Sequence, residues 1–328
     1  MVVKTLILLS TYIGTFILML FTPLPVWSVL VCWAIMGFAV AGIGMSVMHD
    51  ANHGAYSNKS WVNNLIGYTL NLCGGAVLNW KLQHNVLHHT YTNVTHYDDD
   101  IEDKPVLRFS PHTKSKSVHR TQFVHAFLFY SLLTLYWVVG KDFVQYFKYT
   151  KNGVNKNSPA QNRIFLLKII LIKTVYLGII IGLPVYLGGY TLGLILAGFL
   201  LMHAISGIVL TVIFQLAHSV EGTEHPLPDD LGKLENNWAI HQMITTVNFS
   251  PDNKLLSWYV GGLNYQVEHH LFPNICHVHY PALAPIVKQT AEEFGVPYQV
   301  NPTFWQAVKS HIALLQKFGR PSANEAIA

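Results

Sequence analysis

Histidines gathered in three short clusters are the residues of this chain best suited to chemistry. The clusters read HDANH (His49, His53), HNVLHH (His84, His88, His89) and QVEHH (His269, His270), and His218 stands between the last two. Imidazole binds iron, zinc and copper well, and an ionisable side chain beside apolar segments usually has a function. The repeated short spacings therefore predict a metal site that holds more than one ion.

The spacing within each cluster predicts how its rings are presented. The first pair, and also His84 with His88, are four residues apart, so both rings of a pair lie on one face of a helix. His89 adds a ring turned by about 100° from its neighbour. In the third cluster, Gln266 lies one helical turn before His270. Together, these donors could serve two ions.

Several other polar residues are candidates for the same site. His218 ends a long apolar run and is predicted to be a ligand. Metal-bound histidines usually donate their second N–H to a carboxylate or a carbonyl, which gives acidic neighbours of the clusters a role. Candidates for a metal contact, or for holding a ligand in place, are His241, Gln266, Asp50 and Glu268. The run Asp98–Asp100 is another candidate, but we interpret it first as a solvated turn.

The ligand types restrict the metal. The three cysteines are scattered and lack CxxC spacing, so nitrogen and oxygen must supply most of the ligands. Zinc, copper and iron all remain possible by ligand type. A single zinc ion needs about four ligands and leaves many of the histidines unexplained. Two irons would use them, and would suit oxygen chemistry on an apolar substrate.

Composition predicts that the clusters belong to a membrane protein. Of the 328 residues, 51% are hydrophobic and only 12% are charged, which is too apolar for an ordinary soluble domain. The formal charge of +4 is mild and gives no reason to expect nucleic-acid binding. The apolar start lacks a clear cleavage site, and Pro23 and Pro25 follow it, so we predict a helical hairpin in place of a signal peptide.

The apolar runs predict an all-α membrane protein with four spanning helices in two hairpins. A spanning helix needs about 20 apolar residues. We place the spans at about 5–22, 26–48, 165–187 and 190–216, with weaker helices at about 61–78 and 123–139. We treat residues 1–328 as a single domain, in which about 79–122, 140–164 and 219–328 form a helical cap that carries the metals.

The position of the clusters predicts whether the two weaker helices span the membrane, and the basic residues predict which side of the membrane the clusters face. If all clusters share one site, the chain crosses the membrane an even number of times between them, so both weaker helices must lie flat or re-enter. The loop 81–168 is rich in Lys and Arg, whereas the turns near Pro25 and Gly188 have none. The positive-inside rule therefore places the clusters and both termini in the cytoplasm.

The order of the motifs HDANH, HNVLHH and QVEHH around two apolar hairpins closely resembles that of the membrane fatty acid desaturase family. The resemblance covers about residues 46–286, and QVEHHLFP is similar to the front-end acyl desaturases. It implies a non-haem di-iron enzyme that uses O₂ and two electrons to insert a cis double bond into an acyl-CoA or an acyl lipid. The implied ligands are the seven histidines of the clusters and His218. Gln266 stands where other desaturases have a histidine.

The resemblance also bears on the electron supply. Many front-end enzymes carry a fused cytochrome b5 domain with an HPGG motif, which this sequence lacks. We therefore expect a separate donor, either ferredoxin or cytochrome b5. The basic residues between Lys104 and Lys156 could dock such an acidic partner, or they could contact the membrane surface.

Three other functions were weighed. A di-iron lipid hydroxylase would use similar clusters and differ in its product, an alcohol. A histidine-rich metal transporter would need polar residues along its spans, which are nearly bare apart from Lys173 and His203. A purely structural membrane protein would leave the clusters unexplained.

Overall fold

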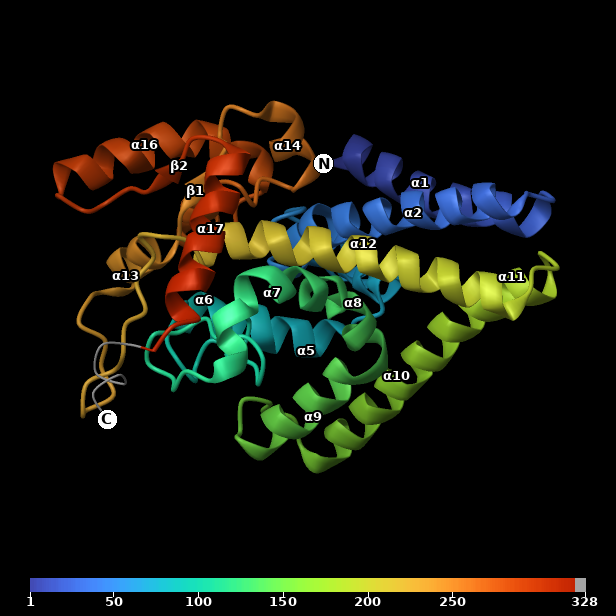
Figure 1. The fold of residues 1–328 in the computed structure, drawn as a ribbon, viewed down its shortest axis with the longest axis horizontal. Helices are drawn as coiled ribbons and strands as arrows, with labels where there is room; N and C mark the ends of the chain where they lie inside the picture. The colour runs from blue at the N-terminus through green and yellow to red at the C-terminus, as the bar shows by residue number, and fades with distance from the viewer. Residues whose placement is uncertain (322–328) are drawn as a thin grey trace. The chain divides into compact units, whose positions relative to one another are not determined.

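The computed structural model describes residues 1–321, so the last part of the expected cap, 322–328, lies outside the described residues. The chain is mostly helical, which confirms the predicted fold class (Figure 1). Its contacts divide it into two compact units. Unit 1 comprises Met1–Leu82 and Phe129–Thr211, and unit 2 comprises Gln83–Leu128 and the chain from Val212 onward.

Unit 1 is built from helices, several of which contain π-helical turns. In chain order they are α1 (Val2–Phe21), α2 (Val26–Gly42), π-helix η1 (Ile43–Val47), α3 (Met48–Asn52), α4 (Ser60–Gly67), 3₁₀-helix η2 (Tyr68–Cys73), α5 (Val77–Lys81), α8 (Leu133–Tyr136), π-helix η5 (Trp137–Lys141), α9 (Asp142–Lys151), α10 (Pro159–Leu177), π-helix η6 (Gly178–Gly182) and α11 (Leu183–Tyr186). Three helices continue from one unit into the other along the chain: π-helix η3 (Leu82–His88), α7 (Gln122–Ser131) and α12 (Leu192–His218).

Four helices are long and apolar enough to cross a membrane, as predicted. They cover Val2–Phe21, Val26–Asn52, Pro159–Tyr186 and Leu192–His218. The second and third remain continuous through their π-helical turns. The expected weak segment 61–78 forms α4 and η2, which are too short to span. The other weak segment lies in a pair of helices, Ser117–Ser131 and Leu133–Lys151, that are bent by 51°.

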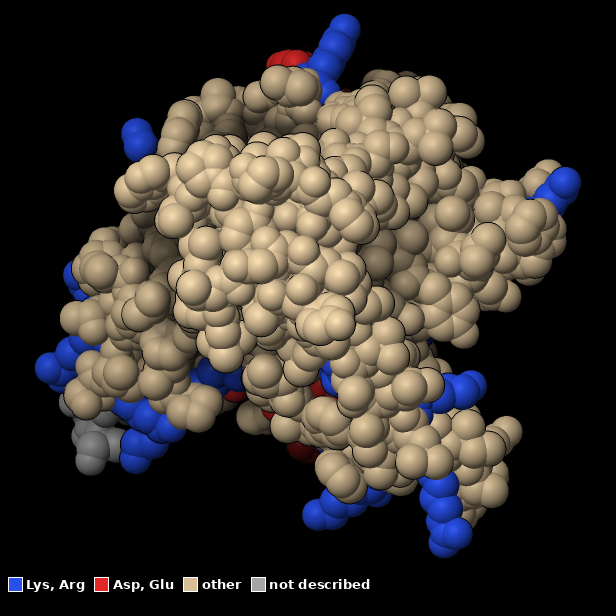
Figure 2. Space-filling view, turned by 90° about the vertical axis from the view of Figure 1, so that its right-hand side faces the viewer, with Lys and Arg blue, Asp and Glu red and all other residues tan. Residues whose placement is uncertain are grey.

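The spanning helices combine a packed inner side with an apolar outer side. Trp33, Met36 and Val40 of α2 are fully buried. Gly198 of α12 permits close approach to α2, because a Cβ there would lie 2.1 Å from the Trp33 ring. Many large apolar side chains of these helices are instead exposed, as expected for contact with lipid: Leu6, Ile13, Phe21, Trp27, Val31, Leu167, Leu171, Leu192 and Leu200. The face shown in Figure 2 is almost free of charge, with basic side chains at its margins.

A buried ion pair joins three segments of unit 1. The Lys173 ammonium of α10 donates to the Asp142 carboxylate and to the Gly74 carbonyl, and also to the Trp137 carbonyl at 2.7 Å. Asp142 is 0% exposed and also accepts the Ala76 backbone N–H at 3.0 Å. The pair therefore ties α10 to the turn before α5 and to the start of α9.

His203 has a structural role in the fourth span. Its Nδ1 lies 3.0 Å from the Thr134 hydroxyl, and its Nε2 lies 3.0 Å from the Tyr176 hydroxyl. Both ring nitrogens thus take part in hydrogen bonds between helices of unit 1, which accounts for an ionisable residue at this depth.

Unit 2 consists of short helices and one small sheet. Its remaining elements are α6 (His89–Tyr91), 3₁₀-helix η4 (Ser117–Thr121), α13 (Trp238–Thr245), β1 (Asn248–Phe249), α14 (Lys254–Tyr259), α15 (Gln266–Leu271), 3₁₀-helix η7 (His277–His279), α16 (Tyr280–Glu293), β2 (Val300–Asn301) and α17 (Phe304–Phe318). The strands are parallel, with Asn248 paired to Val300. Polar side chains cap the N-termini of α13 and α17. Asn237 accepts a hydrogen bond from the Ile240 backbone N–H at 3.1 Å, and Thr303 forms a capping box with Gln306.

A buried glutamine joins two distant segments of unit 2. Gln122 is 0% exposed and accepts the Arg108 backbone N–H at 2.8 Å. Its amide nitrogen donates to the carbonyls of Arg108 at 3.0 Å and Leu315 at 2.9 Å. All three bonds involve backbone groups, so Gln122 supports the fold without touching a histidine ring.

The buried residue His311 of unit 2 makes the stability of the folded protein depend on pH. His311 of α17 is 0% exposed, its Nδ1 lies 2.6 Å from the Ser219 carbonyl, and burial lowers its pKa to about 4. The unfolded chain, with a His pKa of about 6.5, takes up the proton first as pH falls. The contribution of His311 to the free energy of unfolding is therefore fully present above about pH 6.5. It falls by about 3 kcal/mol as the pH is lowered to about 4.

The pH effect can be measured on the metal-free protein. The thermal midpoint of the wild type should fall more steeply between pH 7 and pH 4.5 than that of His311→Gln, which keeps an N–H donor but does not titrate. All other titratable groups are the same in the two proteins, so their contributions cancel in the comparison. Parallel midpoint curves for the two proteins would contradict the assignment.

Candidate metal centre

The first histidine cluster lies in unit 1, where the second spanning helix ends. His49 is in α3 and His53 directly follows it, and their ring centroids are 4.7 Å apart. This confirms that the two rings share one face. Both are buried, and each stands edge-on to Trp80 at 5.7 Å. Asp50, a predicted partner, places a carboxylate oxygen 4.0 Å from His49 Nδ1.

The second cluster lies on a π-helix where the sequence predicted an α-helix. η3 ends at His88 and passes directly into α6, which starts at His89. The rings of His84 and His88 are stacked with centroids 5.2 Å apart, and His89 is 4.9 Å from His84. π-Helical turns are rare and often occur at functional sites. The wider turn still keeps all three rings together.

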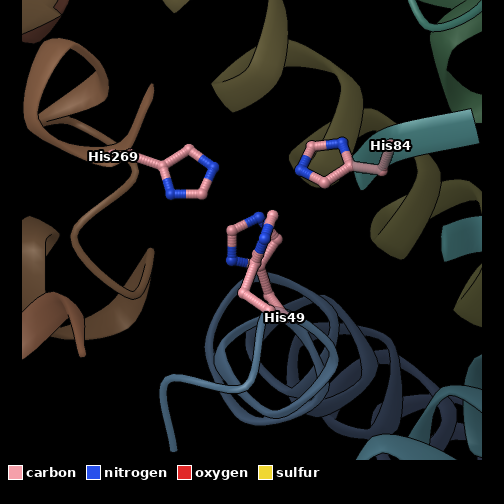
Figure 3. Close-up of side chains that lie close together, drawn as sticks. His49, His84 and His269 are labelled. Carbon is pink, nitrogen blue, oxygen red and sulfur yellow. The ribbon is translucent and has the colours of Figure 1, made fainter. Parts of the chain in front are cut away.

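The third cluster and His218 face the second cluster within unit 2. α15 supplies His269 and His270, and α12 ends at His218. The ring of His270 stacks on His89 at 4.3 Å and lies 4.8 Å from His218. The rings of His84 and His269 are nearly parallel at 6.0 Å, and Figure 3 labels these two together with His49 of unit 1.

Five histidines of unit 2 form two overlapping sets that could each hold a metal ion. One ring nitrogen from each member lies within 4.8 Å of the others in His88, His218 and His270, and again in His89, His269 and His270. All of these residues are buried. His270 belongs to both sets, so the two sets lie next to each other. His49 and His53 belong to the other unit, and their share in the centre remains a prediction.

Carboxylates of the acidic run after the second cluster form hydrogen bonds with two histidines of that cluster. Both oxygens of the Asp98 carboxylate lie 3.0–3.1 Å from His88 Nδ1, and the Asp100 carboxylate lies 2.9 Å from His84 Nδ1. Asp98 is 3% exposed, so the interpretation of this run as a solvated turn is wrong there. Asp98 also accepts the backbone N–H groups of Asn93 and Asp100, which fold the loop back onto η3. These carboxylates hold protons at Nδ1 and leave Nε2 for a metal.

The donor set fits a metal ion. His88 Nε2 is fully buried and has no hydrogen-bond partner within the described residues. Burial alone lowers the pKa of His88, but attraction and hydrogen bonding to Asp98 outweigh this effect and raise it. A buried imidazole nitrogen of this kind needs a partner, and a metal ion satisfies it.

Gln266 lies next to His218, and its part in a metal site stays a prediction. Its amide nitrogen lies 2.8 Å from His218 Nε2, and the side chain is 2% exposed. An amide side chain can offer a metal only its oxygen. In this arrangement the amide nitrogen, which cannot bind a metal, faces the ring of His218.

Glu268 and His241 lie outside the histidine sets. Glu268 accepts from the Asn248 amide and the Tyr298 hydroxyl, each at 2.8 Å, and so connects α15 to the strand region; burial raises its pKa. His241 is 2% exposed and belongs to no group of possible ligands among the described residues. Burial lowers its pKa.

Three neutral side chains that the sequence analysis did not single out touch the rings of the histidine sets. Gln242 Oε1 lies 2.7 Å from His270 Nδ1, the Thr92 hydroxyl lies 3.3 Å from the same nitrogen, and the Tyr280 hydroxyl lies 3.2 Å from His269 Nδ1. Gln242 is adjacent to His241 in sequence, but no local spacing distinguishes it from an ordinary helix residue.

The fold and the site together define a helical protein with membrane-spanning helices and a buried histidine centre that can hold metal. The sequence model of the family named fatty acid desaturase matches residues 6–302, and the chain belongs to this family. It is an acyl desaturase, and therefore an oxidoreductase.

Relatives match along the whole chain. The sn-1 linoleoyl-lipid 6-desaturases of Arthrospira platensis and Synechocystis are both 36% identical to it, over 100% and 98% of this chain and 88% and 89% of the relatives. An acyl-lipid (8-3)-desaturase of Physcomitrium patens is 37% identical over 97% of this chain and 66% of that protein.

Proposed function

We propose that the protein is an O₂-dependent, front-end acyl desaturase that inserts a cis double bond into the acyl chain of a membrane lipid. One observation carries the proposal: two buried histidine sets share His270 in a chain with helices of membrane-spanning length. The names of the relatives, which include lipid 6-desaturases and an acyl-lipid (8-3)-desaturase, support a lipid-linked substrate and a front-end position.

Two irons are the proposed metals. The ligands would be His84, His88, His89, His218, His269 and His270 of unit 2, with His49 and His53 of unit 1. When bound, the irons would activate O₂, the oxidant that removes hydrogen from unactivated C–H bonds, which side chains alone cannot do. The number of imidazoles exceeds the need of one zinc ion, and iron is preferred because, unlike zinc, it supports oxygen chemistry on an apolar substrate.

The chain's own groups would prepare this centre. Asp98 and Asp100 keep the Nδ1 protons of His88 and His84 in place, so that Nε2 is presented without rearrangement. Burial of the rings excludes water, which would otherwise compete for the oxidant. The position of the new double bond would follow from where the acyl chain is held, because a shift of about 1 Å changes which carbons react.

Electrons would come from a separate protein, ferredoxin or cytochrome b5. Lys104, Lys114, Lys116 and Arg120 of unit 2 supply positive charge to attract an acidic donor. The excess of basic residues in the loop 81–168 supports a cytoplasmic location for the clusters and the termini.

Product analysis tests the function. The protein would be expressed in a host with a competent reductase, supplied with defined fatty acids, and the lipids analysed by gas chromatography and mass spectrometry. A new cis double bond between the carboxyl end and an existing double bond is the expected result. A hydroxylated product would support the monooxygenase alternative, and metal uptake without any lipid product would support the transporter. Either outcome would contradict the proposal.

A further inference from the structure

Gln242 of α13 connects the second and third histidine clusters. It is 0% exposed, and each end of its amide contacts a different cluster. The nitrogen Nε2 donates to the His89 backbone carbonyl at 3.2 Å, and the oxygen Oε1 lies 2.7 Å from His270 Nδ1. One side chain thus joins the backbone of the second cluster to a ring of the third.

The end of the second-cluster helix fixes the orientation of this amide. α6 ends at Tyr91, so the His89 carbonyl lies in the last turn and needs donors from elsewhere. It receives two, the Trp238 indole N–H at 3.2 Å and the Gln242 amide. A carbonyl can only accept, so the NH₂ group of Gln242 must face it.

The amide orientation in turn fixes the proton on His270. With NH₂ directed at His89, the group facing His270 Nδ1 is the amide oxygen, which can only accept. The Thr92 hydroxyl lies 2.9 Å from the same oxygen and 2.7 Å from the His88 carbonyl, so its proton has acceptors as well. His270 Nδ1 must therefore carry a hydrogen, and Nε2 carries the lone pair.

We infer that Gln242 is a positioning residue of the metal centre: it holds the proton of His270 at Nδ1, so that Nε2 of the histidine shared by both sets is the metal-binding atom. The inference rests on the proposed metal site and adds a residue to it. It gives helix α13 a role in orienting His270, a ring that neither His241 nor the carboxylates near the clusters hold in place. An orienting partner of this kind changes metal affinity by about 10–100-fold when it is removed.

The test measures metal binding in the purified full-length protein in detergent. Each variant is stripped with a chelator and titrated with Co²⁺, whose visible spectrum reports the ligands, and bound iron is measured separately. Gln242→Leu removes both contacts, and we expect a Co²⁺ affinity lower by about 10–100-fold. Gln242→Glu keeps an acceptor for His270 but cannot donate to His89, and it should bind Co²⁺ close to the wild-type level.

Gln122→Leu is the matched control, because Gln122 is an equally buried glutamine of unit 2 whose bonds all involve backbone groups. It should lower the thermal midpoint and leave Co²⁺ affinity unchanged. Wild-type affinity in Gln242→Leu would overturn the inference, as would equal weakening in Gln242→Glu, which would show that Gln242 acts as a helix cap alone. If Gln242→Leu does not fold, a Co²⁺ affinity of Gln242→Glu well below the wild-type value would still overturn the inference. Failure of the wild type to bind metal would instead overturn the proposed metal centre.

Discussion

Replacing His88 by alanine is expected to abolish desaturation and to lower the amount of bound iron. His88 is fully buried in one of the two histidine sets, and its Nδ1 lies 3.0 Å from the Asp98 carboxylate, so Nε2 would be the atom that binds the metal. Loss of a ligand should exceed the about 10–100-fold cost of losing a residue that only orients one. Product formation in supplied cells and iron content of the purified protein measure both effects.

His112→Ala is the control for this substitution. The His112 side chain is exposed, and its Nε2 lies 2.6 Å from the His225 carbonyl, outside every histidine set. Activity and iron content should stay at the wild-type level. Full activity in His88→Ala, or equal losses in both variants, would show that the buried histidines of unit 2 are not the metal site.

Replacing Asp142 by alanine is expected to destabilise unit 1 by about 3–5 kcal/mol, because the Lys173 ammonium would stay buried without its counter-ion. Lys173 is 6% exposed in a spanning helix, and Asp142 is 0% exposed. Little folded protein should be recovered from membranes. The thermal midpoint in detergent, followed by size-exclusion chromatography, measures the change.

A double variant separates the charge from the packing. In Lys173→Met with Asp142→Asn, the asparagine oxygen can still accept the Ala76 N–H, and no buried charge remains, so most of the lost stability should return. The exposed pair between Lys104 and Glu102 is the comparison, since Glu102→Ala should cost less than about 1 kcal/mol. A single Asp142→Ala change as mild as Glu102→Ala would refute the structural role of the pair.

Hydropathy was sufficient to predict the spanning helices because a bilayer imposes length and apolarity on each helix by itself. The predicted start of the third span at 165 was late, since the helix begins at Pro159 with a Ser158 capping box and includes polar residues of its first turns. Spacing of four residues likewise predicted the neighbouring rings of His49 and His53. These features depend on local sequence alone.

The groups that hold the histidines could not be predicted in the same way. Asp98 lies ten residues after His88, and Gln242 lies 28 residues before His270, so their contacts depend on how loops and helices fold back. An acidic run is usually solvated, and only the burial of Asp98 shows otherwise. Glu268, which directly precedes the two histidines of the third cluster, points to Asn248 and Tyr298, because neighbouring side chains on a helix face different directions.

The π-helix η1 also affects how the second span would tolerate changes in its length. A π turn holds one residue more than an α turn, so it can absorb an added residue while the helix on either side keeps its facing. Loss of one residue from Ile43–Val47 could therefore be met by a return to α-helical turns. The same loss within α2 would rotate everything beyond it, including His49 and His53, by about 100°. Single-residue deletions a few positions apart in this helix should thus differ sharply in their consequences for the first histidine pair.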